Sequence, residues 1–523
     1  MGRMKFSETA LHGYNSLSNY EISGKVRLKS KGCNFLMNYI KSYFLILLCG
    51  LSIFSYGQTQ VSSWLTNAVE NRQRIIILSD ISGLKEPDDT QSFIRFLLYS
   101  NEFDIEGIIG TGSKYGPFRG DIAYFERLID AYGQVRNNLQ LHSSGYPTGD
   151  HLKSVLRHGQ RGIVGMEGVG NGKNTAGSDL IIEALLKEDA RPLWITIWGA
   201  TGTLAQALWD IKYNKNLNDS EIDLLISRIR VYDIAGQDNA GGWIAKTFPG
   251  IFYIRSSVQF LGFTQGHIPA SQGGNLSVAD DDWFKTNIMG NGPLGSLYPR
   301  RKAMYEGDTP SFLYLYENGL SNPECVYHGG WGGRFRRDKV KNANEYSHTR
   351  VDESAYYDFY LYNDALDSWS YQGVKYNDVY CPLFRWREEY QNDFLARMRW
   401  TILPFAEANH NPVPIIDGDS TKEIIIKNIE AGRSYIADAS STFDPDRDSL
   451  SFEWFYYREA GTYNGEIQIL DADSPKAQLT IPDNAVGTEI HVILKVKDSG
   501  SPNLYSYRRF VIHVIGKSNT NFK

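Results

Sequence analysis

Apolar, strand-like segments alternate with helix-forming segments from residue 74 onward, which leaves few folds open to this chain. Residues 75–78 form a short apolar run, and a helical pattern begins at Pro87. Residues 103–113, 192–209 and 228–248 repeat this plan of an apolar run followed by a glycine-rich or polar turn. Strands that alternate with helices build a mostly parallel sheet, and ligands bind beyond the carboxyl ends of its strands. The sequence therefore predicts an α/β fold.

The period of the apolar pattern changes near residues 409–420, which are rich in Pro and Asp. Beyond them, short segments such as residues 450–457 and 489–498 alternate apolar and polar side chains between turn-forming residues. Such a pattern is typical of an immunoglobulin-like β-sandwich. We therefore expect an α/β domain over residues 70–405 and an all-β domain over residues 409–516. A Pro-rich junction between domains is expected to make few contacts.

Residues 1–57 have the pattern of a leader and are not expected to belong to either domain. Lys41 precedes the uncharged run "SYFLILLCGLSIFSYG", and small residues allow cleavage before Gln58. Met37 is an alternative start, because residues 1–36 show no signal pattern. The run is short for a membrane span, which needs about 20 apolar residues, although a retained anchor stays an alternative. We expect a secreted or periplasmic protein with no stable membrane insertion.

Composition narrows the class of partner. The formal net charge of −6 over 523 residues argues against nucleic acid, because phosphate binding needs a basic face. Tyr and Trp are plentiful, which suits carbohydrate-facing surfaces and ordinary cores equally. Removal of the leader would leave two cysteines, Cys325 and Cys381, whose pairing cannot be established from sequence.

Three carboxylates surround the turn that follows the first predicted strand. Asp80 ends the strand, and Asp88 and Asp89 open the next helix, with Gly83 allowing the loop to fold back. A hard cation such as Ca²⁺ takes about 6–8 oxygen ligands, and three acids at one sheet edge would supply several of them. The alternative is that one aspartate caps the helix, where its charge suits the helix dipole.

The stretch "LSDISGLKEPDDTQSF" resembles the acidic signature of nucleoside hydrolases, in which an aspartate at the first strand end and an Asp-Asp pair hold Ca²⁺. The segment "IWGATGTLAQAL" looks like the family turn that donates a backbone carbonyl to the metal, which falls here at Gly202. The segment "YEGDTPSF" resembles the late segment whose aspartate, here Asp308, completes the metal shell. The resemblance therefore implies a Ca²⁺ site formed by Asp80, Asp88, Asp89, Gly202 and Asp308.

A narrower resemblance covers almost all of residues 74–515. The segments "EPDDTQSFIRFLLYSNEFDIEGII", "EGDTPSFLYL" and "WGGRF" look like exported nucleoside-hydrolase-like proteins, often labelled cellulose-binding, that carry a C-terminal immunoglobulin- or cadherin-like domain. Two departures limit what carries over. Leu78 stands where nucleoside hydrolases have a further aspartate, and no histidine precedes Asp308 to protonate a base. Metal binding transfers well under this resemblance, whereas nucleoside specificity does not.

The resemblance also points to residues around the metal site. Glu167 lies in a glycine-flanked acidic loop and is a candidate general acid or sugar ligand, although it could simply cap the loop. Asp238 and Asn239 lie where the family places sugar-binding amides. Glu306, in the segment of Asp308, is expected to contact substrate. Trp331 is expected in the pocket wall, with a core position as its alternative.

The turn "FDPDRDSL" in the predicted sandwich resembles the acidic turn of polycystic-kidney-disease-like and cadherin-like modules. Asp444, Asp446 and Asp448 could hold a second Ca²⁺, or the side chains could bond their own backbone in a tight turn. Trp454 is expected in the sandwich core rather than on a sugar-binding surface.

These observations predict an exported, Ca²⁺-dependent hydrolase of glycosidic or N-glycosidic bonds, acting on oligosaccharides, with Asp80 as general base. A carbohydrate-binding protein with a degenerate site is the first alternative, and a secreted nucleoside hydrolase is the second. A structure that brings Asp80, Asp89 and Asp308 within reach of one ion would favour catalysis, and a missing shell would favour binding alone. Oligomeric state stays open.

Overall fold

The computed structural model describes residues 72–85, 87–263, 269–300, 305–340 and 351–517. Residues 59–523 form one compact unit, and the predicted leader lies outside the described residues. None of the helices in the described ranges combines the length and the apolar content that a membrane span needs.

The first part of the chain builds an eight-stranded sheet in the order β3-β2-β1-β4-β5-β6-β8-β7. All neighbours are parallel except β7, which runs antiparallel to β8. The strands are β1 (Gln73–Ser79), β2 (Phe103–Gly110), β3 (Leu156–His158), β4 (Leu193–Ile197), β5 (Ile229–Ile234), β6 (Phe252–Ser256), β7 (Phe335–Val340) and β8 (Phe359–Asp364). This mostly parallel sheet confirms the α/β prediction.

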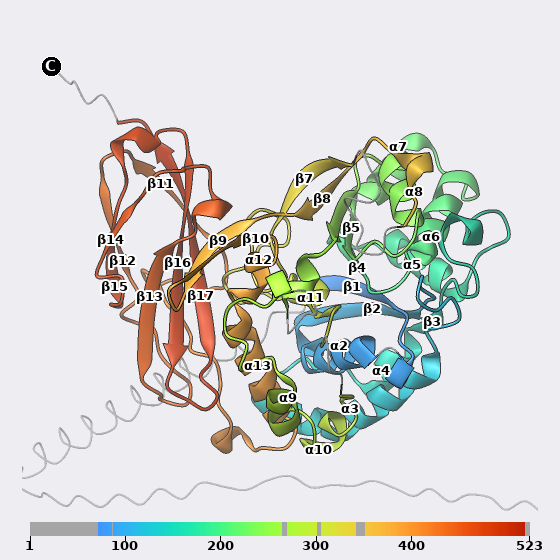
Figure 1. Ribbon diagram of the computed structural model, residues 1–523, viewed down its shortest axis with the longest axis horizontal. Helices are drawn as coiled ribbons and strands as arrows, with labels where there is room; N and C mark the ends of the chain where they lie inside the picture. The colour runs from blue at the N-terminus through green and yellow to red at the C-terminus, as the bar shows by residue number, and fades with distance from the viewer. Residues whose placement is uncertain (1–71, 86, 264–268, 301–304, 341–350, 518–523) are drawn as a thin grey trace, which may run out of the picture. The chain divides into compact units, whose positions relative to one another are not determined.

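Helices cover both faces of this sheet (Figure 1). Side chains alternate along β1, so that Ile75 and Ile77 enter one core while Ile76 and Leu78 enter the other. The first core includes α2 (Pro87–Leu98), α3 (Ile122–His142), α11 (Thr309–Leu313) and α13 (Arg387–Arg399), and the second includes α5 (Ala176–Leu186), α6 (Gly202–Tyr213), α7 (Asp219–Ser227) and α8 (Ala240–Thr247). The shorter helices are α4 (Gly149–Ser154), α9 (Asp281–Asn287), α10 (Gly292–Gly295) and α12 (Cys381–Phe384).

A two-stranded hairpin, β9 (Asp367–Tyr371) and β10 (Val374–Asp378), follows the large sheet. The C-terminal part then forms two further sheets, ordered β11-β17-β16-β13 and β12-β15-β14. Their strands are β11 (Ile425–Glu430), β12 (Ser434–Asp438), β13 (Leu450–Tyr456), β14 (Gln468–Leu470), β15 (Lys476–Thr480), β16 (Glu489–Asp498) and β17 (Tyr505–Ile515). Trp454 is buried in the core that these sheets share, which confirms its expected place.

The two parts are joined by buried polar contacts. Arg509 of β17 is fully buried and donates hydrogen bonds to the backbone oxygens of Leu320, His328 and Gly329 at 2.8, 2.9 and 3.0 Å. Each of these carbonyls would lack that partner if the guanidinium were removed. Arg509 therefore ties the C-terminal sheets to a loop of the α/β part.

The residues that lead into the junction make buried contacts. Asn409 donates to Asp498 at 3.0 Å, and its backbone oxygen accepts from Trp400 at 2.9 Å. His410 is fully buried and stacks on Phe405 with ring centroids 3.9 Å apart. Asn409 and His410 are thus held at the start of the junction because their buried polar groups need partners, and few contacts over residues 411–420 stay a prediction. The exact domain boundaries stay a prediction.

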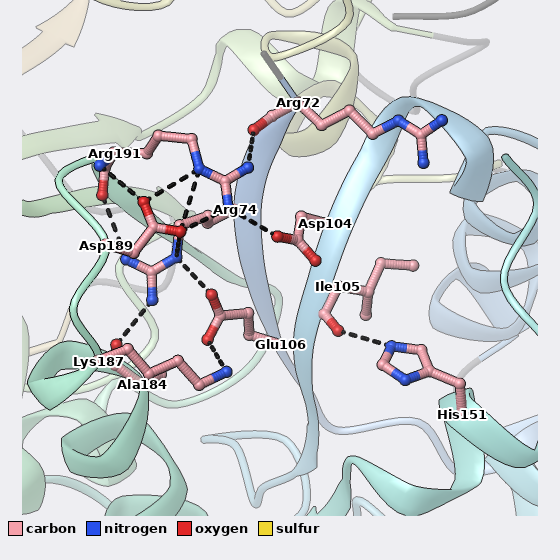
Figure 2. A network of polar contacts seen from close by, with 10 residues as sticks. All are labelled: Arg72, Arg74, Asp104, Ile105, Glu106, His151, Ala184, Lys187, Asp189 and Arg191. Atoms are coloured by element: carbon pink, nitrogen blue, oxygen red, sulfur yellow. Dashed lines mark hydrogen bonds and ion pairs between the residues drawn. The ribbon is translucent and has the colours of Figure 1, made fainter. Parts of the chain in front are cut away.

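The amino ends of β1 and β2 carry a network of ion pairs (Figure 2). Arg74 is buried and pairs with Glu106, which also pairs with Lys187 at 2.7 Å. Arg191 pairs with Asp104 at 2.8 Å and with Asp189 at 2.5 Å. Acids and bases are thus matched at this edge of the sheet.

Replacing Arg509 with Leu should lower the free energy of unfolding by roughly 3 kcal/mol or more, because several buried acceptors lose their donor at once. Urea unfolding followed by tryptophan fluorescence measures the loss. The matched control is Arg433→Leu, an exposed arginine of the same β part, which should change stability by less than about 0.5 kcal/mol. Equal effects of the two substitutions would contradict the proposed tie.

Candidate functional site

Four buried aspartates come together from three elements. Asp80 directly follows β1, Asp88 and Asp89 lie in the first turn of α2, and Asp308 immediately precedes α11. We call these four residues the acidic cluster. Their exposed fractions lie between 2% and 7%, so water reaches them only in part.

The acids of this cluster interact electrostatically. Burial raises the pKa of Asp89 well above its ordinary value, and the negative charges of Asp308, Asp80 and Asp88 raise it further. A hydrogen bond of 2.5 Å from the Ser79 hydroxyl opposes the rise. The structure therefore places the four acids close enough to repel one another, as expected for three of them from sequence.

Asp80 has two donors on the same oxygen. The Ser113 hydroxyl donates to Oδ2 at 2.6 Å, and Arg119 pairs with Oδ2 at 3.4 Å. Burial raises the pKa of Asp80 to about 6, while Ser113 and Arg119 lower it and the charge of Asp88 raises it. On the other side, a Cβ at Gly199 would lie only 3.0 Å from Oδ1, so a glycine lets the chain after β4 approach Asp80 closely.

Sequence reasoning missed Ser113 and Arg119. Ser113 follows the end of β2, beside the end of β1, and the rule that polar residues at strand ends share one edge could have identified it. Arg119 lies in an irregular loop that gave no signal of its partner.

The acidic cluster fits a hard divalent cation in its donor chemistry, because it offers only carboxylate oxygens. Its spacing is looser than a compact shell. Two trios of described residues have ligand atoms that all lie within 4.8 Å of one another, and neither comes from the acidic cluster. These trios are Asp104, Glu106 and Asp189, and His328, Glu489 and His491. Three carboxylates of the cluster do not, therefore, form a preassembled shell by themselves.

Asp238 accepts hydrogen bonds from the first residues of two helices. Its two oxygens accept from the backbone N–H groups of Gly202 at 3.1 Å and Ala240 at 3.0 Å, at the beginnings of α6 and α8. Burial raises its pKa to about 6. Asn239 accepts from the N–H of Met166 at 2.9 Å and so tethers the neighbouring loop. Substrate contacts of Asp238 and Asn239, and a metal contact of the Gly202 carbonyl, stay predictions.

Glu167 lies on the loop that Asn239 tethers, within the short 3-10 helix η4 (Gly165–Gly168). Its side chain is exposed, and its backbone oxygen accepts a hydrogen bond from Lys173. The carboxyl group is thus open to a ligand, and its proposed part in catalysis stays a prediction.

Two predicted substrate contacts need correction. Glu306 is fully buried, pairs with Arg95 at 2.7 Å, and has a pKa raised to about 7 by burial. Trp331 is 1% exposed and donates to the Tyr507 hydroxyl at 3.3 Å, where the two parts of the chain meet. Neither side chain reaches a surface from which it could bind substrate, so the core alternative holds for Trp331.

The turn at Asp444 shows the contacts of a tight turn. One oxygen of Asp444 accepts from the N–H groups of Asp446 and Asp448 at 2.8 and 3.0 Å. The carboxylate of Asp446 instead pairs with His410 at 3.0 Å. The bonds of Asp444 match the alternative in which a side chain bonds its own backbone in a tight turn, and a second Ca²⁺ at this turn stays a prediction. Cys325 and Cys381 are both free thiols.

Family models match two stretches of the chain. Residues 74–335 match the nucleoside hydrolase-like domain of cellulose-binding Sde182, and residues 435–514 match the C-terminal domain of cellulose-binding protein Sde0182. No curated protein matches the chain.

Solved structures give a similar result. A nucleoside hydrolase-related hypothetical protein from Saccharophagus degradans, described as associated with carbohydrate metabolism, is 39% identical with a TM-score of 0.74. The match covers 85% of this chain and 100% of that chain. Two further matches have TM-scores too low to carry an inference. A PKD domain from the KIAA 1837 protein is 21% identical with a TM-score of 0.15, over 19% of this chain and 88% of that chain. Human CDH23 EC21-23 is 14% identical with a TM-score of 0.16, over 20% of this chain and 33% of that chain.

Removing one charge from the acidic cluster should stabilise the protein when no divalent cation is present. The pKa of Asp89 is higher in the folded than in the unfolded protein, so protonation of this side chain favours the folded state. This contribution to the free energy of unfolding is complete below the unfolded-state pKa and is lost as pH rises through the folded-state pKa. In chelator at pH 8, Asp89→Asn should therefore raise the free energy of unfolding, because the substitution removes a buried charge that its neighbours repel. The gain should shrink as pH falls towards 4.

Denaturant melts at several pH values measure this difference, with the exposed Asp150→Asn as a control that should change nothing. A variant that is less stable than the wild type at pH 8 would contradict mutual repulsion within the acidic cluster.

Proposed function

This chain belongs to the family of cellulose-binding proteins with a nucleoside hydrolase-like domain, and on that premise we propose that it is an exported hydrolase of glycosidic or N-glycosidic bonds in oligosaccharides. The observation that carries the proposal is the acidic cluster at the carboxyl end of β1, where ligands bind in sheets of this kind. A carbohydrate is favoured over a nucleoside because no histidine precedes Asp308 to protonate a leaving base.

Asp80 would act as the general base. Burial raises its pKa to about 6, so near neutral pH it is ionised and still basic enough to accept a proton from water. Ser113 and Arg119 hold one of its oxygens and so fix the direction of the carboxylate. The deprotonated water would attack the anomeric carbon as the glycosidic bond breaks.

Bound Ca²⁺ would be held by the acidic cluster and the Gly202 carbonyl, and would supply positive charge to sugar hydroxyls and to the attacking water. The burial and mutual repulsion of the four acids support this assignment, because a bound cation would offset the cost of burying their charges and would reduce their repulsion. Glu167 is the residue we propose as the proton donor to the leaving group, since its side chain is exposed.

A second function, carbohydrate binding without catalysis, is favoured by one specific observation. No three side chains of the acidic cluster form a compact shell, and Arg119 already places a positive charge beside Asp80. A site in which the arginine has taken over the role of the cation would bind sugars without hydrolysing them.

Hydrolysis should be detectable when purified protein is incubated with a panel of plant and algal oligosaccharides and with nucleosides, with and without chelator. Asp80→Asn should lower the rate by a factor of about 10²–10⁴, because the general base is lost while the shape is kept. Asp150→Asn, which is exposed, should keep the full rate. A wild type that hydrolyses no member of the panel, yet binds one, would favour the second function.

Ca²⁺ binding can be measured separately by titration calorimetry. Asp80→Ala, Asp89→Ala and Asp308→Ala should each abolish the binding of Ca²⁺ at this site, and Asp150→Ala should not. Ca²⁺ should also raise the melting temperature of the wild type, because a ligand that binds only the folded state stabilises it by mass action. Unchanged affinity in Asp80→Ala would show that the acidic loop is only a turn and a helix cap.

A further inference from the structure

A second site lies away from the acidic cluster. A groove of about 1080 Å³ is lined on one side by the β9–β10 hairpin and on the other by β13, β16 and the start of β17. Figure 1 shows the hairpin beside these strands. The volume lies slightly above the range of about 300–1,000 Å³ that is usual for drug-sized ligands. The groove is therefore large enough for a ligand of several sugar units.

Three aromatic side chains form a row along the hairpin wall. Trp369 and Tyr371 lie two residues apart on β9, and Tyr376 pairs with Trp369 across the hairpin. Ring centroids lie 5.3 Å apart between Trp369 and Tyr371 and 6.1 Å apart between Trp369 and Tyr376, with planes 23° and 26° from parallel. All three are only half-buried. We call Trp369, Tyr371 and Tyr376 the aromatic row.

The aromatic row is fixed from behind. Phe384 of α12 is buried, and its ring lies 4.9 Å from that of Tyr376 and 6.1 Å from that of Trp369. Such contacts hold the rings in place before a ligand arrives, so a ligand would lose little affinity in ordering them. The row is thus a preformed apolar surface that stays partly open to solvent.

The opposite wall carries polar groups that hold one another. Lys495 of β16 pairs with Glu453 at 2.7 Å and with Glu389 at 3.3 Å. The Tyr505 hydroxyl donates to Glu388 at 2.8 Å. Around the groove, basic side chains are as numerous as acidic ones. The lining therefore offers many hydrogen-bonding groups without a net charge that would attract a charged polymer.

A neutral sugar chain matches this combination. The C–H faces of pyranose rings are apolar and pack on aromatic surfaces, while hydroxyl groups around the ring need donors and acceptors at the sides. We propose that the groove binds a neutral glucan chain, packed against the aromatic row and hydrogen-bonded to the polar wall. This inference rests on the proposed carbohydrate-directed function for its ligand class, and it adds a binding site that needs no catalysis.

Binding of cellohexaose, measured by titration calorimetry in the presence of chelator, tests the proposal. The full chain should bind, and Trp369→Ala and Tyr371→Ala should each weaken the affinity at least tenfold. Ser451→Trp fills the groove from an exposed position of β13 without removing a packed ring, and should also weaken binding at least tenfold. Tyr213→Ala removes an exposed aromatic ring of α6 outside the groove and should bind as the wild type does.

The outcomes of these binding measurements separate this proposal from the hydrolase proposal. No binding by the wild type, or binding that Ser451→Trp leaves unchanged while the variant melts normally, would overturn the groove assignment whatever the enzyme assays give. Retained groove binding without any hydrolysis would overturn only the hydrolase. Pentagalacturonate, a charged glycan, should bind at least tenfold more weakly than cellohexaose, and equal affinity would overturn the choice of a neutral chain.

Discussion

Burial of like charges at the end of β1 is the constraint on which the site depends. Removing a carboxylate from water disfavours its ionised form, and the neighbouring acids add repulsion, so the pKa of Asp89 lies well above its ordinary value. Ser79, Ser113 and Arg119 compensate only part of this cost. The fold tolerates the arrangement because the extensive apolar cores on both faces of the sheet supply its stability.

The opposite edge of the sheet shows why spacing alone does not identify an ion site. Asp104, Glu106 and Asp189 lie close enough to share one ion, yet Arg74, Lys187 and Arg191 already neutralise them (Figure 2). A similar argument applies to His491, whose Nδ1 lies 2.9 Å from Arg509. A guanidinium can only donate, so it occupies that lone pair and fixes the proton on Nε2, which faces Glu489. In the acidic cluster, by contrast, burial and mutual repulsion still raise the pKa of Asp80 and Asp89 although Arg119 pairs with Asp80, and this makes it the better candidate.

The sequence was informative where a local rule set the position of a side chain. The apolar periodicity correctly predicted that Asp80 follows the first strand and that α2 starts at Pro87, because both features follow from nearby residues alone. The predicted substrate contact of Glu306 was wrong because the position of Asp308 does not determine where the Glu306 side chain points. The backbone at Glu306 has a φ of 52°, and its side chain pairs with Arg95, from a helix more than two hundred residues away in sequence. For Trp331 the sequence left the pocket wall and the core open, and it could not decide between them because the partner Tyr507 belongs to the other part of the chain.

The C-terminal sheets are more than an appended module. Arg509 joins them to the α/β part through three backbone carbonyls, and Tyr457 donates a hydrogen bond of 2.6 Å to Asp367 at the start of β9. Asp367 also pairs with Arg334 at 2.6 Å, so the hairpin that carries the aromatic row is anchored from both parts. Neither part alone contains both walls of the groove. The same buried polar contacts that join the two parts therefore create a surface on which a long ligand could be held outside the acidic cluster.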